Sequence, residues 1–327
     1  MPDSLNRPVA GRDYPRTWEQ FLDLFPDETA CLNYLEQLRW PAGFVCLRCE
    51  NASEPYRAKR SRLMCRHCGY QGTVTAGTVF AKTRTPLRNW FAAAWYMTNQ
   101  KNGVSALGLQ RVLGLGSYQT AWSMLHRLRR SMVRPDRDQL SGKVEVDESY
   151  VGGPGRFLSH KNPGQMRRWQ KNTAKAIVAV AVEVHEPKGF GRIRLRRVPQ
   201  AAETHLLPFV SEVILPGSIV HTDGSHIYAQ LTKRGYVHER SIMAGSDNPA
   251  HASMPAVHRV ASLLKRWLLG THQGAVQLHH LDDYLDEYTF RFNRRTSRSR
   301  GMLFYRLLEQ AVITEPVTYR DIADKNL

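Results

Sequence analysis

Two pairs of cysteines constrain this chain more than any other feature of its sequence. Cys46 and Cys49 form one CxxC turn, and Cys65 and Cys68 form a second turn after a short polar loop. Each turn presents two thiolates on one side of a tight knuckle, and two knuckles complete a tetrahedral shell around Zn²⁺. Because four thiolates leave no position open for water, the predicted zinc is structural, and its binding supplies most of the folding energy of so small a module.

The fifth cysteine, Cys31, lies outside this spacing, in a segment of helical periodicity, and we expect it to be a buried thiol. His67 lies inside the second knuckle and is expected to face solvent. A redox role for CxxC would need one reactive pair in an αβ context, which this segment lacks. The N-terminus has no secretion signal and no apolar run is long enough to span a membrane, so we expect a cytoplasmic protein with no membrane partner.

The charge of the chain points to a polyanionic partner. Its formal net charge is +17, with a pI near 9.9. No acidic residue occurs between Glu54 and Asp136, whereas lysines and arginines are spread through that whole segment. Chance surface charge would mix the two signs, and cations that neutralise phosphates release counterions and so favour binding. The distribution therefore predicts contact with nucleic acid.

Helical periodicity accounts for much of the first half. Apolar residues from Thr17 to Leu38 predict one or two helices broken near Pro26, with Asp27 as N-cap of the second. Between Pro86 and Met132 the spacing predicts three helices, which resemble a helix-turn-helix although a plain three-helix bundle has the same signature. In the DNA-binding interpretation, the last helix offers three arginines to phosphates or bases: Arg127, Arg129 and Arg130.

After Lys143 the pattern changes to strands. Strands are expected at Val144–Val151, Ala174–Val184, Ile193–Val198 and Ser218–His221, and helices at Glu203–Val213, Pro255–Leu269 and Leu278–Phe292. The alternating arginines of the third strand suggest one exposed face. A basic, glycine-containing insertion from Gly153 to Thr173 reads as a loop that orders on DNA or as a surface hairpin.

Two aspartates mark the candidate reaction site. Asp147 lies in an acidic run within a strand, where Glu145 shares its face by alternation and Glu148 points to the other face. Asp223 lies at the end of the fourth strand, before Gly224. Adjacent carboxylates repel one another unless a cation is present, and a pair of Mg²⁺ ions can be held by carboxylates from neighbouring strand ends. Each aspartate alone has an ordinary structural explanation, a solvated edge or an Asp-Gly turn, so the argument rests on their combination.

Six segments together resemble the zinc-ribbon insertion-sequence transposases of the ISXO type. They are FVCLRC at 44–49, CRHCG at 65–69, TAGTVF at 75–80, VEVDESYVGG at 144–153, HTDG at 221–224, and residues 284–295. The resemblance extends over roughly residues 17–295. It implies an RNase H-like fold of the DDE type, with Asp147 and Asp223 as the first two ligands of catalytic Mg²⁺ or Mn²⁺.

The third acid of that family pattern is absent from its usual place. In its register His258 replaces the glutamate and Lys265 takes the position of the following lysine. Imidazole is a poor partner for hard Mg²⁺. Glu287 is an alternative acid, although the aromatic residues around it indicate a packed helix on which it could simply be exposed. Phosphates near the reacting strand are expected to contact a set of basic residues, for which an ordinary basic helix surface is the alternative: Lys265, Arg266, Arg291, Arg294 and Arg295.

The resulting fold class is multidomain α+β. We expect a helical segment plus zinc ribbon at 16–80, a helix-turn-helix-like DNA-binding region at 86–135, an RNase H-like α/β catalytic domain with a mixed sheet at 140–297, and a C-terminal tail at 298–327.

The leading function is a DNA transposase that cleaves and joins strands at insertion-sequence ends. Its expected partners are double-stranded DNA of the terminal inverted repeats and of the target. The resemblance further implies a bacterial, nucleoid-associated protein that acts as a homo-oligomer. The alternatives are a non-catalytic zinc-ribbon DNA-binding regulator or transposase remnant, and a structure-selective nuclease of the same fold.

Overall fold

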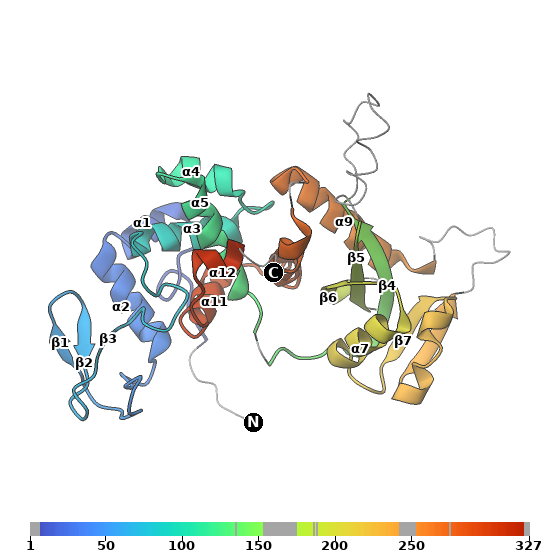
Figure 1. Ribbon diagram of the computed structural model, residues 1–327, viewed down its shortest axis with the longest axis horizontal. Helices are drawn as coiled ribbons and strands as arrows, with labels where there is room; N and C mark the ends of the chain where they lie inside the picture. Colours follow the sequence, from blue (N-terminus) through green and yellow to red (C-terminus); the bar gives the residue numbers. More distant parts are fainter. Residues whose placement is uncertain are drawn as a thin grey trace. The chain divides into compact units, whose positions relative to one another are not determined.

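The computed structural model describes residues 7–134, 136–152, 175–185, 187, 189–241, 253–274 and 276–323. The basic insertion at Gly153–Thr173 lies outside these residues. The chain divides into two compact units, which Figure 1 shows. The helical unit comprises residues 1–135 and 294–327, and the sheet unit comprises residues 136–293.

The helical unit begins with two short helices and a small sheet. Helices α1 (Trp18–Leu24) and α2 (Glu28–Arg39) are separated at Pro26, and the Asp27 side chain accepts a hydrogen bond from the amide of Ala30, as an N-cap does. Strands β1 (Tyr56–Ala58), β2 (Arg62–Met64) and β3 (Gln71–Thr73) form an antiparallel sheet in the order β1-β2-β3. Along the chain, one cysteine knuckle precedes β1 and the other follows β2.

Three further helices follow, as the periodicity predicted. They are α3 (Leu87–Asn99), α4 (Ala106–Leu113) and α5 (Tyr118–Arg130). Ser105 and Ser117 cap α4 and α5, and Gly114 ends α4 in the left-handed conformation that glycine adopts without strain. Each of the three helices contacts the other two.

The C-terminal segment is part of the helical unit. Residues for which the sequence indicated only a tail form α11 (Gly301–Ala311) and α12 (Tyr319–Ala323). Figure 1 shows these red helices beside the blue and green ones; α11 packs against α2 and α3, and α12 against α5. Gly301 makes this docking possible, since a Cβ there would lie 1.8 Å from the carbonyl oxygen of Pro15.

The sheet unit is built on five strands in the order β6-β5-β4-β7-β8. Strands β4 (Lys143–Val151), β5 (Ala176–Val184) and β6 (Phe190–Val198) pair antiparallel, whereas β7 (Ile219–Asp223) and β8 (Val237–Ser241) run parallel to β4. The sheet is therefore mixed, which confirms the predicted RNase H-like fold class. Strand β8 was not predicted, because it is short and mostly exposed.

Helices cover both faces of this sheet (Figure 1). On one face α7 (Glu203–Val213) packs with the buried side chains of Val144 and Val146. On the other face α9 (Pro255–His272) and α10 (Leu281–Phe292) cover the valines of β5. The described part of the unit also contains three short 3₁₀ helices, at His226–Tyr228 (η1), Thr232–Arg234 (η2) and Leu278–His280 (η3).

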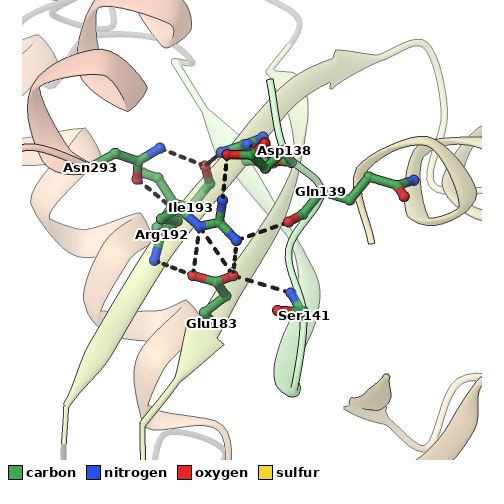
Figure 2. A network of polar contacts seen from close by, with 8 residues as sticks. Asp138, Gln139, Ser141, Glu183, Arg192, Ile193 and Asn293 are labelled. Atoms are coloured by element: carbon green, nitrogen blue, oxygen red, sulfur yellow. Dashed lines mark hydrogen bonds and ion pairs between the residues drawn. The ribbon is translucent and has the colours of Figure 1, made fainter. Parts of the chain in front are cut away.

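The arginines of β6 correct one sequence expectation. They were predicted to mark an exposed face, but Arg194 is only 4 % exposed, and Arg192 is held by Glu183 of β5 (Figure 2). The Glu183 carboxylate also accepts a hydrogen bond from the amide of Ser141, and Arg192 donates to the carbonyl of Gln139. Burial alone would raise the pKa of Glu183, but these bonds outweigh it and hold that pKa below its usual value. The network anchors the segment that leads into β4.

None of the described helices is long and apolar enough to cross a membrane.

Candidate metal and catalytic sites

The four predicted zinc ligands lie together at one end of the helical unit's small sheet. Their sulfur atoms are all within 4.8 Å of one another. The Sγ atoms of Cys46 and Cys68 are 3.7 Å apart, as are those of Cys49 and Cys65. A Zn–S bond of about 2.3 Å separates the corners of a tetrahedron by about 3.8 Å. The cluster therefore fits a four-thiolate zinc, and these cysteines would hold it.

The fifth cysteine lies apart from this cluster. Within the cluster, partial desolvation opposes ionisation of Cys46, but the amides of Cys49 and Arg48 hydrogen bond to its sulfur and lower its pKa to about 6. At Cys49 a hydrogen bond from the amide of Asn51 is outweighed by desolvation and the neighbouring sulfur atoms, which raise the pKa of Cys49 to about 12. Cys31 is fully buried in α2, and burial raises the pKa of its thiol to about 12. Cys31 is thus the apolar thiol that the sequence predicted, and His67 is exposed, also as predicted.

The two aspartates are placed by the parallel pairing of β4 with β7. In that register Glu145 lies opposite His221, and regular pairing ends there. Asp147 and Asp223 each follow two residues later, so alternation directs both to the same face of the sheet at the same level. The sheet brings the aspartates onto neighbouring strands, at the point where those strands separate.

Asp147 has an environment that disfavours its charged form. It is half-buried, and desolvation raises its pKa to about 7, with further contributions from the charges of Glu148, Asp223 and Glu145. The amide of Glu148 donates to its Oδ1 at 2.8 Å, which acts in the opposite direction. The largest charge contributions to this pKa come from neighbouring carboxylates. Such a group of hard oxygen donors suits a divalent cation.

Two neighbours of the aspartates were not assigned a role from the sequence. The hydroxyl of Tyr228, from η1, donates to Oε2 of Glu148 at 3.1 Å, and the Tyr228 side chain is 1 % exposed. Burial raises the pKa of Glu148, and the charge of Asp223 raises it further. Because Glu148 points to the opposite face of β4 from Asp147, only the three-dimensional position of η1 shows this contact.

Glu145 lies on the same face as Asp147 but has a structural partner. It is 3 % exposed, and its Oε2 accepts a hydrogen bond from the amide of Val257 at 2.9 Å. The amides at the start of α9 have no acceptor within their own helix, so a carboxylate there caps the helix and complements its dipole. Glu145 thereby fixes the N-terminus of α9 over the strand that carries Asp147.

The structure does not bring the expected third residue into one compact group with the two aspartates in the part of the chain that it describes. His258 is half-buried in the first turn of α9; burial raises the pKa of Glu145, and the charge of His258 acts in the opposite direction on that carboxyl. Within the described ranges, no group of three donor residues within 4.8 Å of one another contains the two aspartates and His258. Lys265 is exposed further along α9. The expectation that Glu287 is exposed is wrong, because it is fully buried in α10, 3.3 Å from Arg291.

The arginines proposed to contact DNA differ in accessibility. Arg130 and Arg266 are exposed, and Arg127, Arg294 and Arg295 are half-buried. Burial, with the nearby charges of Arg134 and Arg306, lowers the pKa of Arg294 to about 10. Arg129 is 1 % exposed, so its assignment to a DNA surface finds no support, because a buried guanidinium does not meet a phosphate at the surface.

Comparison with known proteins identifies two transposase domains in the chain. Residues 139–293 match the family described as the ISXO2-like transposase domain, and residues 26–71 match the transposase zinc-ribbon domain. The chain is also 27 % identical over 289 residues to an uncharacterized protein in the transposable element ISH50 of Halobacterium salinarum, a match that covers 85 % of this chain and 94 % of that protein. Fold, cysteine cluster and both family matches agree: the chain belongs to the zinc-ribbon insertion-sequence transposases of the ISXO type.

Proposed function

We propose that this transposase cleaves DNA strands at the ends of an insertion sequence and joins the freed 3′-hydroxyl ends to target DNA. The observation that carries the proposal is the pair Asp147 and Asp223 on neighbouring parallel strands, with the pKa of Asp147 raised to about 7 by desolvation and by the charges of nearby carboxylates. A catalytic carboxylate pair that binds metal has this character, whereas a structural carboxylate such as Glu183 is satisfied by an arginine.

In the proposed mechanism the aspartates are the ligands of catalytic Mg²⁺ or Mn²⁺. Bound there, the ions would activate the attacking oxygen and stabilise the leaving one in an in-line displacement at phosphorus. Glu148 adds negative charge to this group and is oriented by Tyr228. Glu145 holds α9 over the site, which keeps His258 and Lys265 on the same side of the sheet as the proposed reaction.

The remaining site residues have proposed roles in binding DNA. Lys265 and Arg266 on α9 are exposed cations that suit phosphates of the reacting strand. Arg127 and Arg130 of α5, with Arg294 and Arg295, would contact the double-stranded ends or the target. These contacts would position DNA without reading its sequence.

A non-catalytic DNA-binding regulator is the second candidate. One observation favours it: in the part of the chain that the structure describes, the two aspartates are not joined by a third ligand in a compact group. A regulator would bind inverted-repeat DNA in Mg²⁺ without nicking it. A structure-selective nuclease would cut DNA but would not join the product to a target.

The test compares Asp147→Asn and Asp223→Asn with wild type on DNA carrying the element's ends, in Mg²⁺ or Mn²⁺. Each variant should lose cleavage by roughly 10³-fold or more, since several kcal/mol of charge stabilisation depend on the ions. DNA affinity should stay within about threefold, which separates chemistry from binding. The matched control is Asp282→Asn, because Asp282 is an exposed carboxylate of the same unit, paired with Arg197.

The control should cleave at the wild-type rate. Cleavage retained by either aspartate variant would refute the assignment of the site. Wild-type protein that shifts the DNA but never nicks it, in either metal, would favour the regulator.

A further inference from the structure

The helical unit contains a pocket that the catalytic proposal does not use. Its volume is about 360 Å³, at the lower end of the range typical of small-molecule sites. The segment 82–85 before α3 forms one side, α5 forms another, and Tyr319 of α12 contributes an aromatic ring. The lining residues are Lys82, Thr83, Arg84, Thr85, Trp90, Gln119, Thr120, Ser123, Met124, Arg127 and Tyr319.

The chemistry of this lining is that of an anion site. It includes three cations, Lys82, Arg84 and Arg127, and no carboxylate. Lys82 and Arg84 are exposed, whereas Arg127 is half-buried, so positive charge extends from the surface into the pocket. Hydroxyl groups from two elements add neutral donors. Like charges gathered without an acid favour binding of a negative group between them.

Arg127 supplies the second observation. Its Nε is buried and has no hydrogen-bond partner among the described residues, although buried polar atoms are almost always paired. Burial lowers the pKa of Arg127. A buried guanidinium donor without an acceptor destabilises the fold, and an oxyanion would supply that acceptor.

The opposite wall is held in place before any ligand arrives. Thr83 Oγ1 accepts hydrogen bonds from Trp90 Nε1 at 2.9 Å and from the amide of Thr85 at 3.1 Å, and donates to the carbonyl of Thr85. Lys82 has a φ of 55°, a left-handed conformation that is uncommon for a residue with a side chain. The segment that carries Lys82 and Arg84 is thus fixed by internal bonds, which reduces the entropy lost on binding.

We propose that this pocket binds one nucleotide of a DNA strand, with the phosphate on Arg127, Arg84 and Lys82 and the nucleoside against Tyr319. The phosphate provides the acceptor that Arg127 lacks. Tyr319 is 47 % exposed, and its ring meets Trp122 in an edge-to-face contact, so a base or sugar can still pack against it. The ligand is a phosphodiester within a strand, and the proposal does not depend on whether the sheet unit cuts DNA.

The test measures the affinity of the full chain, with zinc bound, for a fluorescent DNA oligonucleotide over a range of salt concentrations. Arg127→Gln should weaken binding by about tenfold and reduce the salt slope by about one, as expected for one lost phosphate contact. Arg84→Gln, at an exposed position that tolerates substitution, should have a smaller effect of the same kind. Arg111→Gln is the matched control, because Arg111 is an exposed arginine of α4 that does not line the pocket.

Thermal stability measured in inorganic phosphate shows whether the pocket binds a free anion, whereas the DNA affinities show whether it binds a phosphate within a DNA strand. Equal DNA affinity and salt slope in wild type, Arg127→Gln and Arg84→Gln would overturn the proposal, even if inorganic phosphate raised the thermal stability of wild type alone. If Arg127→Gln and Arg111→Gln lost DNA affinity equally, the effect would come from net charge alone, and this result would also overturn the proposal. Cleavage plays no part in this measurement, so a failure here is distinct from a failure of the aspartate site.

Discussion

The two candidate metal sites of this transposase are built in opposite ways. The four cysteines come from one short segment, and their sulfur atoms lie within 4.8 Å of one another. The aspartates come from β4 and β7, far apart in the chain, and meet only through strand pairing. The cysteine site is closed and local, so it can be structural. Asp147 and Asp223 are each half-buried, so their carboxyl groups are partly accessible, as a reaction with DNA requires.

Of the two candidate metal sites, the cysteine site should show the larger effect on stability when a ligand is replaced. Cys65→Ser should remove zinc and unfold the ribbon, because structural zinc sites contribute on the order of 10 kcal/mol of apparent binding energy. Zinc content and limited proteolysis of the ribbon measure this. Cys31→Ala is the control, since Cys31 is fully buried in α2 and not a ligand, and it should keep one zinc. A Cys65→Ser protein that retains zinc and a protected ribbon would contradict the closed site.

Replacement of Asp147, a proposed metal ligand, should increase stability, whereas loss of a zinc ligand should decrease it. In zinc-containing, magnesium-free buffer at pH 8, Asp147→Asn should raise the free energy of unfolding of the sheet unit by up to about 4 kcal/mol, since one pKa unit is worth about 1.4 kcal/mol and the pKa of Asp147 is raised from 3.8 to about 7. A raised carboxyl pKa means that the folded state binds the proton more tightly than the unfolded state. Wild-type stability from this group is therefore greatest below pH 4 and is lost as pH rises to 7.

Denaturant unfolding from pH 4 to pH 8 tests this sign, with Glu183→Gln as its counterpart. The pKa of Glu183 is lowered, so its contribution is present above pH 4.5 and is lost as pH falls below that value. Glu183→Gln should thus destabilise the unit at neutral pH by about 1–3 kcal/mol. If both variants destabilise the protein at pH 8, Asp147 is a structural carboxylate like Glu183.

Variants of Glu145 test whether this acid of β4 has a structural role, in contrast to the catalytic role proposed for Asp147 on the same strand. Glu145→Ala removes the cap from the buried amides of α9 and should cost about 1–2 kcal/mol of stability, as loss of a helix cap does. Glu145→Gln keeps one acceptor oxygen and should lose less. Chemical denaturation measures both, and the residual cleavage of Glu145→Gln should remain within about tenfold of wild type, as for loss of a supporting contact. Complete loss of cleavage in a stable Glu145→Gln protein would place Glu145 among the metal ligands.

The same contrast explains what the sequence could predict. The zinc cluster follows from spacing alone, and the cap Asp27 follows from local hydrogen bonding. Strands β4, β5 and β7 were predicted from runs of valine and isoleucine. The arginines of β6 were predicted wrongly to mark an exposed face, because local alternation does not reveal that Glu183 on the neighbouring strand pairs with Arg192 or that Arg194 is buried. For residues 298–327 only a tail was predicted, because the docking of α11 depends on a close approach between Gly301 and Pro15, which lie far apart in the chain.

The contact between Tyr228 and Glu148, which depends on tertiary structure, gives the smallest expected effect. Tyr228→Phe removes the donor to Glu148, so it should cost about 0.5–1.5 kcal/mol of stability and let the pKa of Glu148 rise further. Protonation at a higher pH would weaken metal binding there, so the acid limb of cleavage should move to higher pH, with little change at pH 8. Tyr236→Phe is the matched control, since its hydroxyl donates to the carbonyl of Ile214 within the same core. Cleavage measured against pH in Mn²⁺ decides between them: an equal shift in both variants would mean that the tyrosine acts only through the core, whereas a shift confined to Tyr228→Phe would make Glu148 part of the acidic site.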